Sequence, residues 1–88
     1  MRAEPTNDAE TLALTALAAT LTDERRAQRF LDLSGIDTEG LRHRAAEPVL
    51  LAALLRFLEA HEPDLIDVAC AIGVKPEALV AAREELEA

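Results

Sequence analysis

The sequence of 88 residues is poor in aromatic residues, cysteine and glycine, and each scarcity limits what the chain can be. Tryptophan and tyrosine are absent and only Phe30 and Phe57 are aromatic, so a core has to be built from aliphatic side chains. Cys70 has no second cysteine to pair with, which excludes an internal disulfide. Because Cys70 has alanine on both sides and no neighbouring positive charge, we expect an unreactive residue that is buried or half-buried.

Long apolar runs are missing as well. No stretch reaches the roughly 18–20 residues that a membrane span requires. The polar start at residues 1–5 is not followed by the apolar segment of a signal peptide. We therefore expect a cytoplasmic protein with no membrane partner. We also expect residues 1–7 to be a disordered N-terminal tail and residues 8–88 to be a single helical domain.

Positive charge is scarce, because nine Lys and Arg residues stand against 17 Asp and Glu residues and the formal net charge is −8. The imbalance is concentrated in residues 46–88, which have three basic and nine acidic residues. Residues 1–45 have six arginines and eight acidic residues. An acidic surface repels nucleic-acid phosphates and anionic lipid. We interpret the charge as a solubilising surface, with a basic protein partner as the alternative.

Half of the residues are hydrophobic, and alanine, leucine, glutamate and arginine dominate, which favours helices over strands. The sequence predicts an all-α fold, a compact orthogonal bundle of five or six short helices joined by short connections. Thr22 is expected to cap the second helix. The helices are expected at residues 8–21, 23–34, 38–45, 48–60, 63–72 and 76–87.

The apolar spacing indicates which sides of these helices are buried. Residues 48–60 are apolar nearly all round, apart from Arg56 and Glu59, so they are expected to form the central helix. Buried stripes are expected at Leu14, Leu17 and Leu21 beside Ala13 and Ala16, at Phe30, Leu31 and Leu33, and at Leu79, Ala82 and Leu86.

Gly35 and Gly73 stand in similar phrases, 38 residues apart. Each phrase predicts a helix that ends on a left-handed glycine, an apolar residue that covers the corner, and a new helix that starts at Asp37 or Pro76. We interpret the likeness as two solutions of the same geometric problem and not as a duplication.

The second corner, in residues 63–87, also resembles the general helix-turn-helix pattern. The packing positions of that pattern are occupied by Ala69, Gly73, Val74, Leu79 and Ala82. A recognition helix needs basic or amide side chains near its start to reach bases and phosphates. Among the positions expected to be exposed only Lys75 is cationic, so nucleic acid is not the expected partner. A helix-turn-helix-like nucleic-acid-binding protein using residues 63–87 is the alternative function.

Arginines supply the remaining candidate surface. No aromatic residue stands among them to stack on bases. They either form a face that binds an acidic partner or are a solvated face with ion pairs to Asp23, Asp32 and Glu39. This candidate partner-binding basic face consists of Arg25, Arg26, Arg29, Arg42 and Arg44.

Motifs for catalysis or metal binding are missing from the sequence. It has no glycine-rich phosphate loop and no nucleophile elbow. His61 precedes Glu62, Asp64 and Asp67, but this spacing matches no zinc or calcium pattern, and we expect His61 at the end of the 48–60 helix. We predict no catalytic residues, no metal, no cofactor, no small-molecule ligand and no enzymatic activity.

The order of these segments over roughly residues 9–86 resembles a family of short all-helical bacterial proteins catalogued as a domain of unknown function. The resemblance implies a helical fold and brings no catalytic residue, cofactor or partner. Where that family tends to have an acidic residue beside Glu62, this chain has His61. The residues that carry the resemblance are Ala13 to Leu17, Arg29 to Ile36, Leu41 and Arg42, Pro48, Leu51, Leu54, Phe57, Leu58, Glu62, Pro76, Glu77, Ala82, Arg83 and Leu86.

The function that these observations favour is a protein–protein interaction or regulatory module. The apolar helix at 48–60 and the leucine-rich helix at 8–21 offer more apolar surface than a small bundle needs, and a leftover patch would mark a partner site. The partner is another protein or a second copy of the chain in a homodimer.

Overall fold

The structure, a computed structural model, describes residues 8–88, which fold into six α-helices with no strand among them. The expected disordered tail at residues 1–7 lies outside the described residues. The predicted all-α fold is confirmed, and the Cα radius of gyration of 12.3 Å agrees with the expected compactness. The helices are α1 Asp8–Leu21, α2 Glu24–Ser34, α3 Thr38–Arg44, α4 Pro48–Glu59, α5 Glu62–Ile72 and α6 Pro76–Glu87.

Local capping explains where the helices begin. The Asp23 side chain accepts a hydrogen bond from the Arg26 backbone N–H at 3.0 Å and caps α2, so the assignment of this cap to Thr22 was wrong. Thr22 instead donates its hydroxyl to the Ala19 carbonyl at the end of α1. Asp37 caps α3 as predicted, through the Gly40 N–H at 2.7 Å. Proline stands in the first turn of α4, α5 and α6, where its missing N–H costs no helical bond.

Both glycine corners have the expected left-handed backbone, with φ of 74° at Gly35 and 78° at Gly73. Their hydrogen bonds differ. At Gly73 the Val74 N–H reaches the Ala69 carbonyl at 2.9 Å and the Gly73 N–H reaches Cys70, which is the two-bond Schellman arrangement. At Gly35 a single bond runs from its N–H to the Leu31 carbonyl at 3.0 Å. The two corners therefore solve the same helix change with different bonds.

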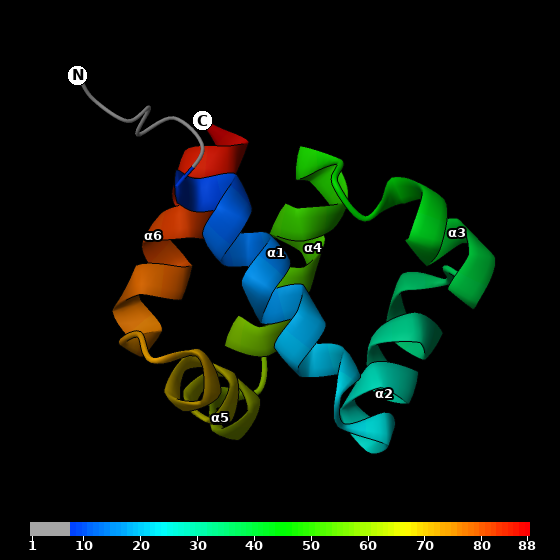
Figure 1. The fold of residues 1–88 in the computed structure, drawn as a ribbon, viewed down its shortest axis with the longest axis horizontal. Helices are drawn as coiled ribbons and strands as arrows, with labels where there is room; N and C mark the ends of the chain where they lie inside the picture. The colour runs from blue at the N-terminus through cyan, green and yellow to red at the C-terminus, as the bar shows by residue number, and fades with distance from the viewer. Residues whose placement is uncertain (1–7) are drawn as a thin grey trace.

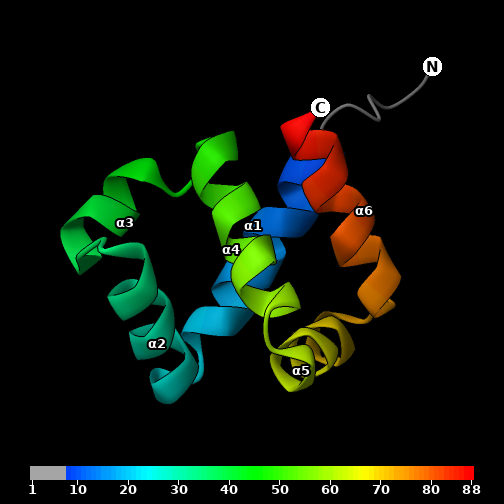
Figure 2. The same ribbon diagram turned by 180° about the vertical axis from the view of Figure 1, so that it is seen from behind.

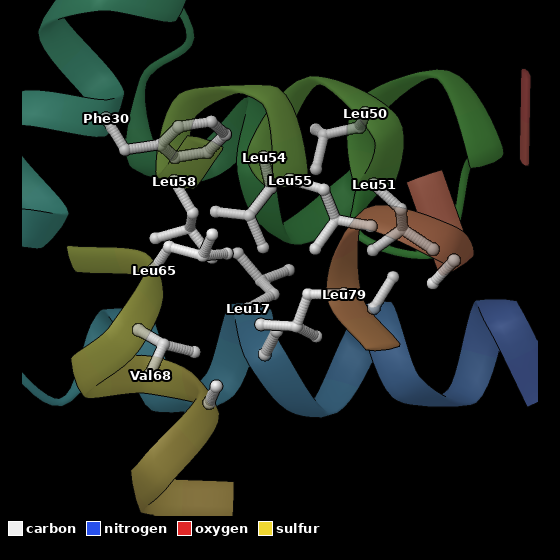
Figure 3. Close-up of a cluster of buried hydrophobic side chains, with 14 of the residues drawn as sticks. Leu17, Phe30, Leu50, Leu51, Leu54, Leu55, Leu58, Leu65, Val68 and Leu79 are labelled. Atoms are coloured by element: carbon white, nitrogen blue, oxygen red, sulfur yellow. The ribbon is translucent and has the colours of Figure 1, made fainter. Parts of the chain in front are cut away.

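The core lies among α1, α4, α5 and α6, which we call the core bundle (Figure 1). Helix α4 is its central element and buries six residues, as the sequence predicted. Ala13 and Ala16 of α1 are fully buried and permit close approach of α1 to α4 and α6. Figure 3 shows the leucines of α4 pointing toward Leu17, Leu65, Val68 and Leu79 from the other three helices.

Helices α2 and α3 project to one side of this bundle, and we call them the arm (residues 24–45; Figures 1 and 2). Helix α2 touches α1 and α4 only lightly. Each arm helix buries one residue, Phe30 in α2 and Leu41 in α3. Gly40 is tightly placed, because a Cβ there would lie 3.1 Å from the Asp37 carboxylate oxygen that caps the helix. The arm is thus attached to the bundle through few side chains.

Three of the predicted buried leucines are exposed instead. Leu14 and Leu21 of α1 face solvent, because the buried stripe of that helix runs through its alanines and Leu17. Leu33 of α2 is 77% exposed, since α2 leans on the bundle through Phe30 and leaves its last turn uncovered. In each case the apolar spacing predicted the helix correctly but included a leucine that does not pack against the core.

Candidate docking groove beside a buried carboxylate

A groove of about 490 Å³ lies between α2 of the arm and α4 of the core bundle. It is closed at one end by the start of α5. The apolar lining residues come from the two facing helices, and the charged ones meet at the α5 end. The lining consists of Arg29, Phe30, Leu33, Ser34, Ala53, Phe57, Ala60, His61 and Asp64.

The α4 wall of the groove is an apolar stripe that the core does not cover. Ala53, Phe57 and Ala60 recur at spacings of four and three, so they share one side of the helix. Val49 continues the same stripe one turn earlier and is 74% exposed. The opposite side of α4 is fully buried, which explains why the sequence of this helix is apolar nearly all round. One side of α4 builds the core and the other builds the groove.

Two aromatic rings form the floor of the groove. Phe30, at 1% exposure, meets the half-buried Phe57 edge to face, with ring centroids 5.4 Å apart. The Arg29 guanidinium lies 5.6 Å from the centre of the Phe57 ring, within range of a cation–π interaction. The only aromatic residues of the chain are thus placed together where the arm meets the bundle.

Asp64 closes the end of the groove and is the principal buried charge of the described residues. Its side chain is 7% exposed. The Arg26 Nε donates to one carboxylate oxygen at 2.9 Å, and the Arg29 Nη2 donates to the other. His61 Nδ1 lies 3.0 Å from that second oxygen, and Arg26 also reaches Asp67 at 3.2 Å. A single carboxylate therefore joins α2 to the first turn of α5.

Burial of Asp64 on its own would raise the pKa of its carboxyl group, since an apolar surrounding disfavours the charged form. The hydrogen bonds from Arg26, His61 and Arg29 outweigh that effect and hold the pKa below its ordinary value. Asp64 is also in the first turn of α5, where the helix dipole favours a negative charge. The carboxylate is therefore ionised at neutral pH and serves as an anchor for the arm.

The predicted basic face is divided by this arrangement. Arg26 and Arg29 meet at Asp64, whereas Arg44 pairs with Glu47 at 3.1 Å, close in sequence. Arg25 and Arg42 are exposed and have no side-chain partner within residues 8–88. The structure does not bring all five arginines into one surface.

The expected ion pairs of these arginines with Asp23, Asp32 and Glu39 were wrong. Asp23 accepts the backbone N–H of Arg26 as the cap of α2, Asp32 accepts from the Gln28 side chain, and Glu39 pairs with His43. Local spacing on a helix suggested these acids as partners. The actual partner, Asp64, lies on α5 at 38 positions from Arg26 and 35 from Arg29.

The prediction that His61 lies at the end of α4 was wrong. Its backbone is extended, and it occupies the N-cap position of α5, from which its ring reaches Asp64. Helix α4 ends at Glu59, and the break at Ala60 and His61 turns the chain toward α5. This turn places both His61 and Asp64 at the groove, and no local sequence motif marked them as neighbours of α2.

A second ion-pair network joins the C-terminal parts of α4 and α6. Arg56 binds Glu87 through two nitrogens at 2.6 and 2.8 Å, and Arg83 binds both Glu59 and Glu87. Glu87 shows a pKa lowered by hydrogen bonds from Arg56 and then Arg83. The network ties α6 to the central helix. It lines no groove, so we assign it a structural role.

The corner between α5 and α6 has the helix–turn–helix shape that the sequence suggested. Val68, Ala69, Leu79 and Ala82 are buried as packing positions. The exposed side of α6 carries mainly carboxylates, namely Glu77, Glu84 and Glu85, with Lys75 just before the helix. Carboxylates repel a phosphate backbone, so no specific observation favours the nucleic-acid alternative.

Three further features of residues 8–88 bear on function: the single cysteine, the capacity to bind a metal ion and the capacity to cross a membrane. Cys70 is exposed on α5, so the expectation of a buried or half-buried thiol was wrong: the residue falls on the outward side of the helix, next to the buried Ala69. No three histidine, cysteine or acidic side chains of this part of the chain gather closely enough to hold a metal ion. None of its helices has the length and apolar character needed to cross a membrane.

A comparison with known protein families identifies the family of this chain. The model of a family described as "Protein of unknown function (DUF3572)" matches residues 6–88, so the chain belongs to this family. The resemblance to a domain of unknown function is therefore confirmed. No curated protein and no solved structure matches the chain.

Proposed function

We propose that this DUF3572 member is a protein-interaction module that receives a helical segment of a partner protein in the groove between α2 and α4. The observation that carries the proposal is the uncovered apolar lining, with Leu33 at 77% exposure on the α2 side and the exposed Ala53 and Ala60 on the α4 side. Exposed apolar side chains that line one concave site are typical of interaction surfaces.

The shape of the groove supports a helical partner. Its walls are two helices, and the described residues contain no strand whose edge could pair with an extended peptide. Ala53 and Ala60 are small and allow another helix backbone to approach α4 closely. An amphipathic helix that lays its apolar side in such a groove is a common recognition mode.

A binding role agrees better with the closed end of the groove than a catalytic role does. Asp64 is already satisfied by Arg26, Arg29 and His61. A carboxylate held in this way is a weak base, since its pKa is lowered and not raised toward neutrality. We therefore propose a module without enzymatic activity, acting in a bacterial cytoplasm, where a single unpaired cysteine is expected.

Affinity capture with matched variants tests the proposal. Tagged wild-type chain is compared with Leu33→Gln, which makes the groove polar, and with Ile66→Gln, which changes a 47% exposed residue of α5 outside the groove. We expect a partner that wild type and Ile66→Gln retain and Leu33→Gln loses, with unchanged thermal midpoints. Equal capture by all three proteins would contradict docking in the groove.

A further inference from the structure

We infer that the groove accepts an acidic amphipathic helix, with its apolar stripe on Leu33, Ala53 and Phe57 and a carboxylate on the outer side of Arg29. The inference rests on the proposed function and adds the chemistry of the partner. It is carried by the distribution of charge over the chain, by the unused hydrogen-bond donors of Arg29, and by the features that disfavour a second copy as the occupant.

Charge is distributed unevenly between the arm and the rest of the chain. Residues 24–45 contain five arginines and four acidic residues, a net charge of +1, whereas the other residues of the chain sum to −9. The arm therefore carries a small positive charge, whereas the rest of the chain taken together is strongly negative. Complementary charge around an apolar site selects the partner and its orientation.

Arg29 and Arg26 differ in how many of their N–H donors are engaged. The Arg26 side chain is 14% exposed and binds two carboxylates through Nε and Nη2, so it is already engaged in holding the arm. Arg29 is 46% exposed and engages Asp64 through Nη2 alone. A guanidinium has five N–H donors, and those on Nε and Nη1 of Arg29 have no acceptor within residues 8–88. They are held over the Phe57 ring, at the junction of the apolar lining and the solvent.

This placement matches one feature of a partner helix. A carboxylate one turn away from an apolar anchor would reach the free edge of Arg29 while the anchor lies on Leu33 and Phe57. A lysine at the same position of the partner would face Arg29 at close range and be repelled. The groove is therefore expected to discriminate by charge as well as by apolar contact.

A second copy of this chain presents exposed apolar residues on acidic helices, Leu14 on α1 and Ile66 on α5, but its charge disfavours it as the occupant. Two chains of charge −8 repel each other. The acidic helix α6 has its apolar residues Leu79 and Ala82 buried within its own bundle, so it presents no apolar stripe to a neighbour. A symmetric contact through the groove would place one arm against the other, with like charge facing like charge. A different protein is the occupant that the charges favour.

Synthetic helices test the inference on the whole chain. The peptides share one leucine stripe at helical spacing and differ only at the flanking polar positions, which are all glutamate, all glutamine or all lysine. Binding is measured by titration of the ¹⁵N-labelled protein, following the amide shifts. We expect the glutamate peptide to bind about tenfold tighter than the glutamine peptide, the effect of about one charge-assisted hydrogen bond, with shifts at residues 29–34 and 53–61.

Two arginine variants separate the groove from the general charge of the arm. Arg29→Gln is expected to abolish most of the preference for glutamate. Arg25→Gln removes the same charge from the same helix, but Arg25 lines a different hollow with Leu21 and Leu31, so the preference is expected to remain. We expect the thermal midpoints of both variants to match that of the wild type, since Arg26 and His61 still hold Asp64. Matching midpoints would show that the fold is intact.

The outcomes distinguish this inference from the proposed function. Equal binding of the glutamate and lysine peptides, an unchanged preference in Arg29→Gln, shifts outside the groove, or no binding of any peptide would overturn the acidic-helix inference. If Leu33→Gln still loses a captured partner in that case, the docking function stands and only the partner chemistry is wrong. If Leu33→Gln captures normally, the proposed function falls with it.

Discussion

The core bundle and the arm differ in composition and are held in different ways, since α4 is apolar nearly all round whereas the arm contains five arginines. Helix α4 alone buries six residues, whereas α2 and α3 bury one each. The bundle is closed by aliphatic packing on all sides of α4 except the groove. The arm is held by Phe30 and Leu41, by the partly buried Leu31, Ile36 and Ala45, and by the ion pairs of Asp64. A docking surface remains because α2 touches α4 only lightly.

The strongest test of this difference removes the aromatic contact of the arm. Phe30→Ala is expected to cost about 3–5 kcal/mol of local or global stability, since a fully buried ring leaves a cavity. We expect NMR signals of residues 24–45 to shift toward disorder while those of α4, α5 and α6 stay dispersed. Leu55→Ala, at 0% exposure in α4, should instead weaken all helices together. Identical loss patterns in the two variants would show that the arm is not a separate unit.

Loss of the buried charge is the next largest change. Asp64→Asn keeps the shape of the side chain but removes the buried negative charge that Arg26 and Arg29 share, and we expect a loss of about 1.5–3 kcal/mol, the range for hydrogen bonds to charged groups. Urea unfolding followed by circular dichroism measures it. The control is Glu87→Gln in the α4–α6 network, where a smaller loss is expected because Glu87 is 30% exposed, its partner Arg56 is 62% exposed, and solvated ion pairs contribute little. A larger loss in Glu87→Gln would reverse the roles assigned to the two networks.

The two glycine corners give a matched pair with a moderate effect. Gly73→Ala and Gly35→Ala each place a Cβ in a left-handed conformation, at a cost of about 1–2 kcal/mol. Neither Cβ would meet another atom within 4 Å, so the backbone alone is tested. Gly73 joins two helices of the core bundle, and its change should lower the midpoint of global unfolding. Gly35 lies within the arm, and its change should loosen residues 24–45 first, as seen by amide exchange.

Acid should act on the arm before the bundle. The pKa of Asp64 is lowered in the folded state, so its contribution is fully present above the unfolded value of about 3.9 and is lost as pH falls through the folded value. We expect arm signals to broaden below about pH 4, and Asp64→Asn to show a flatter decline of stability with acid. Part of the slope should remain, because the pKa values of Asp23 and Glu87 are also lowered. An unchanged slope in Asp64→Asn would contradict the anchoring role.

Sequence reasoning recovered most of the fold because its signals are local. The prolines at the starts of α4, α5 and α6, the cap at Asp37 and the left-handed glycines act within a few residues of the ends they determine. The central position of α4 followed from its composition. Ala13, Ala16 and Leu17 of α1 are buried as expected, but Leu14 and Leu21 were wrongly included because leucines were weighted above alanines, although close helix packing favours the smaller side chain.

The candidate site was largely beyond the reach of the sequence. The groove depends on which side of α2 leans against the bundle, and Leu33 gave no sign that it would be left uncovered. Asp64 was considered only as one of the acidic residues after His61 that match no metal pattern, since its partners Arg26 and Arg29 come from a helix far away in the chain. A buried carboxylate is identified by its surroundings in space. The one available signal was the unequal charge of residues 24–45, which marks the arm as different from the rest.

Native-state hydrogen exchange of the wild-type chain tests most directly whether the arm and the core bundle are separate in stability. We predict that amides of residues 24–34 exchange through an opening of lower free energy than those of residues 50–58, because few buried contacts hold the arm. We also expect a bound partner to raise the protection of the arm more than that of the bundle. Equal free energies of opening in α2 and α4 would contradict a separate arm, since the groove would then lie within one rigid body and not beside a lightly held arm.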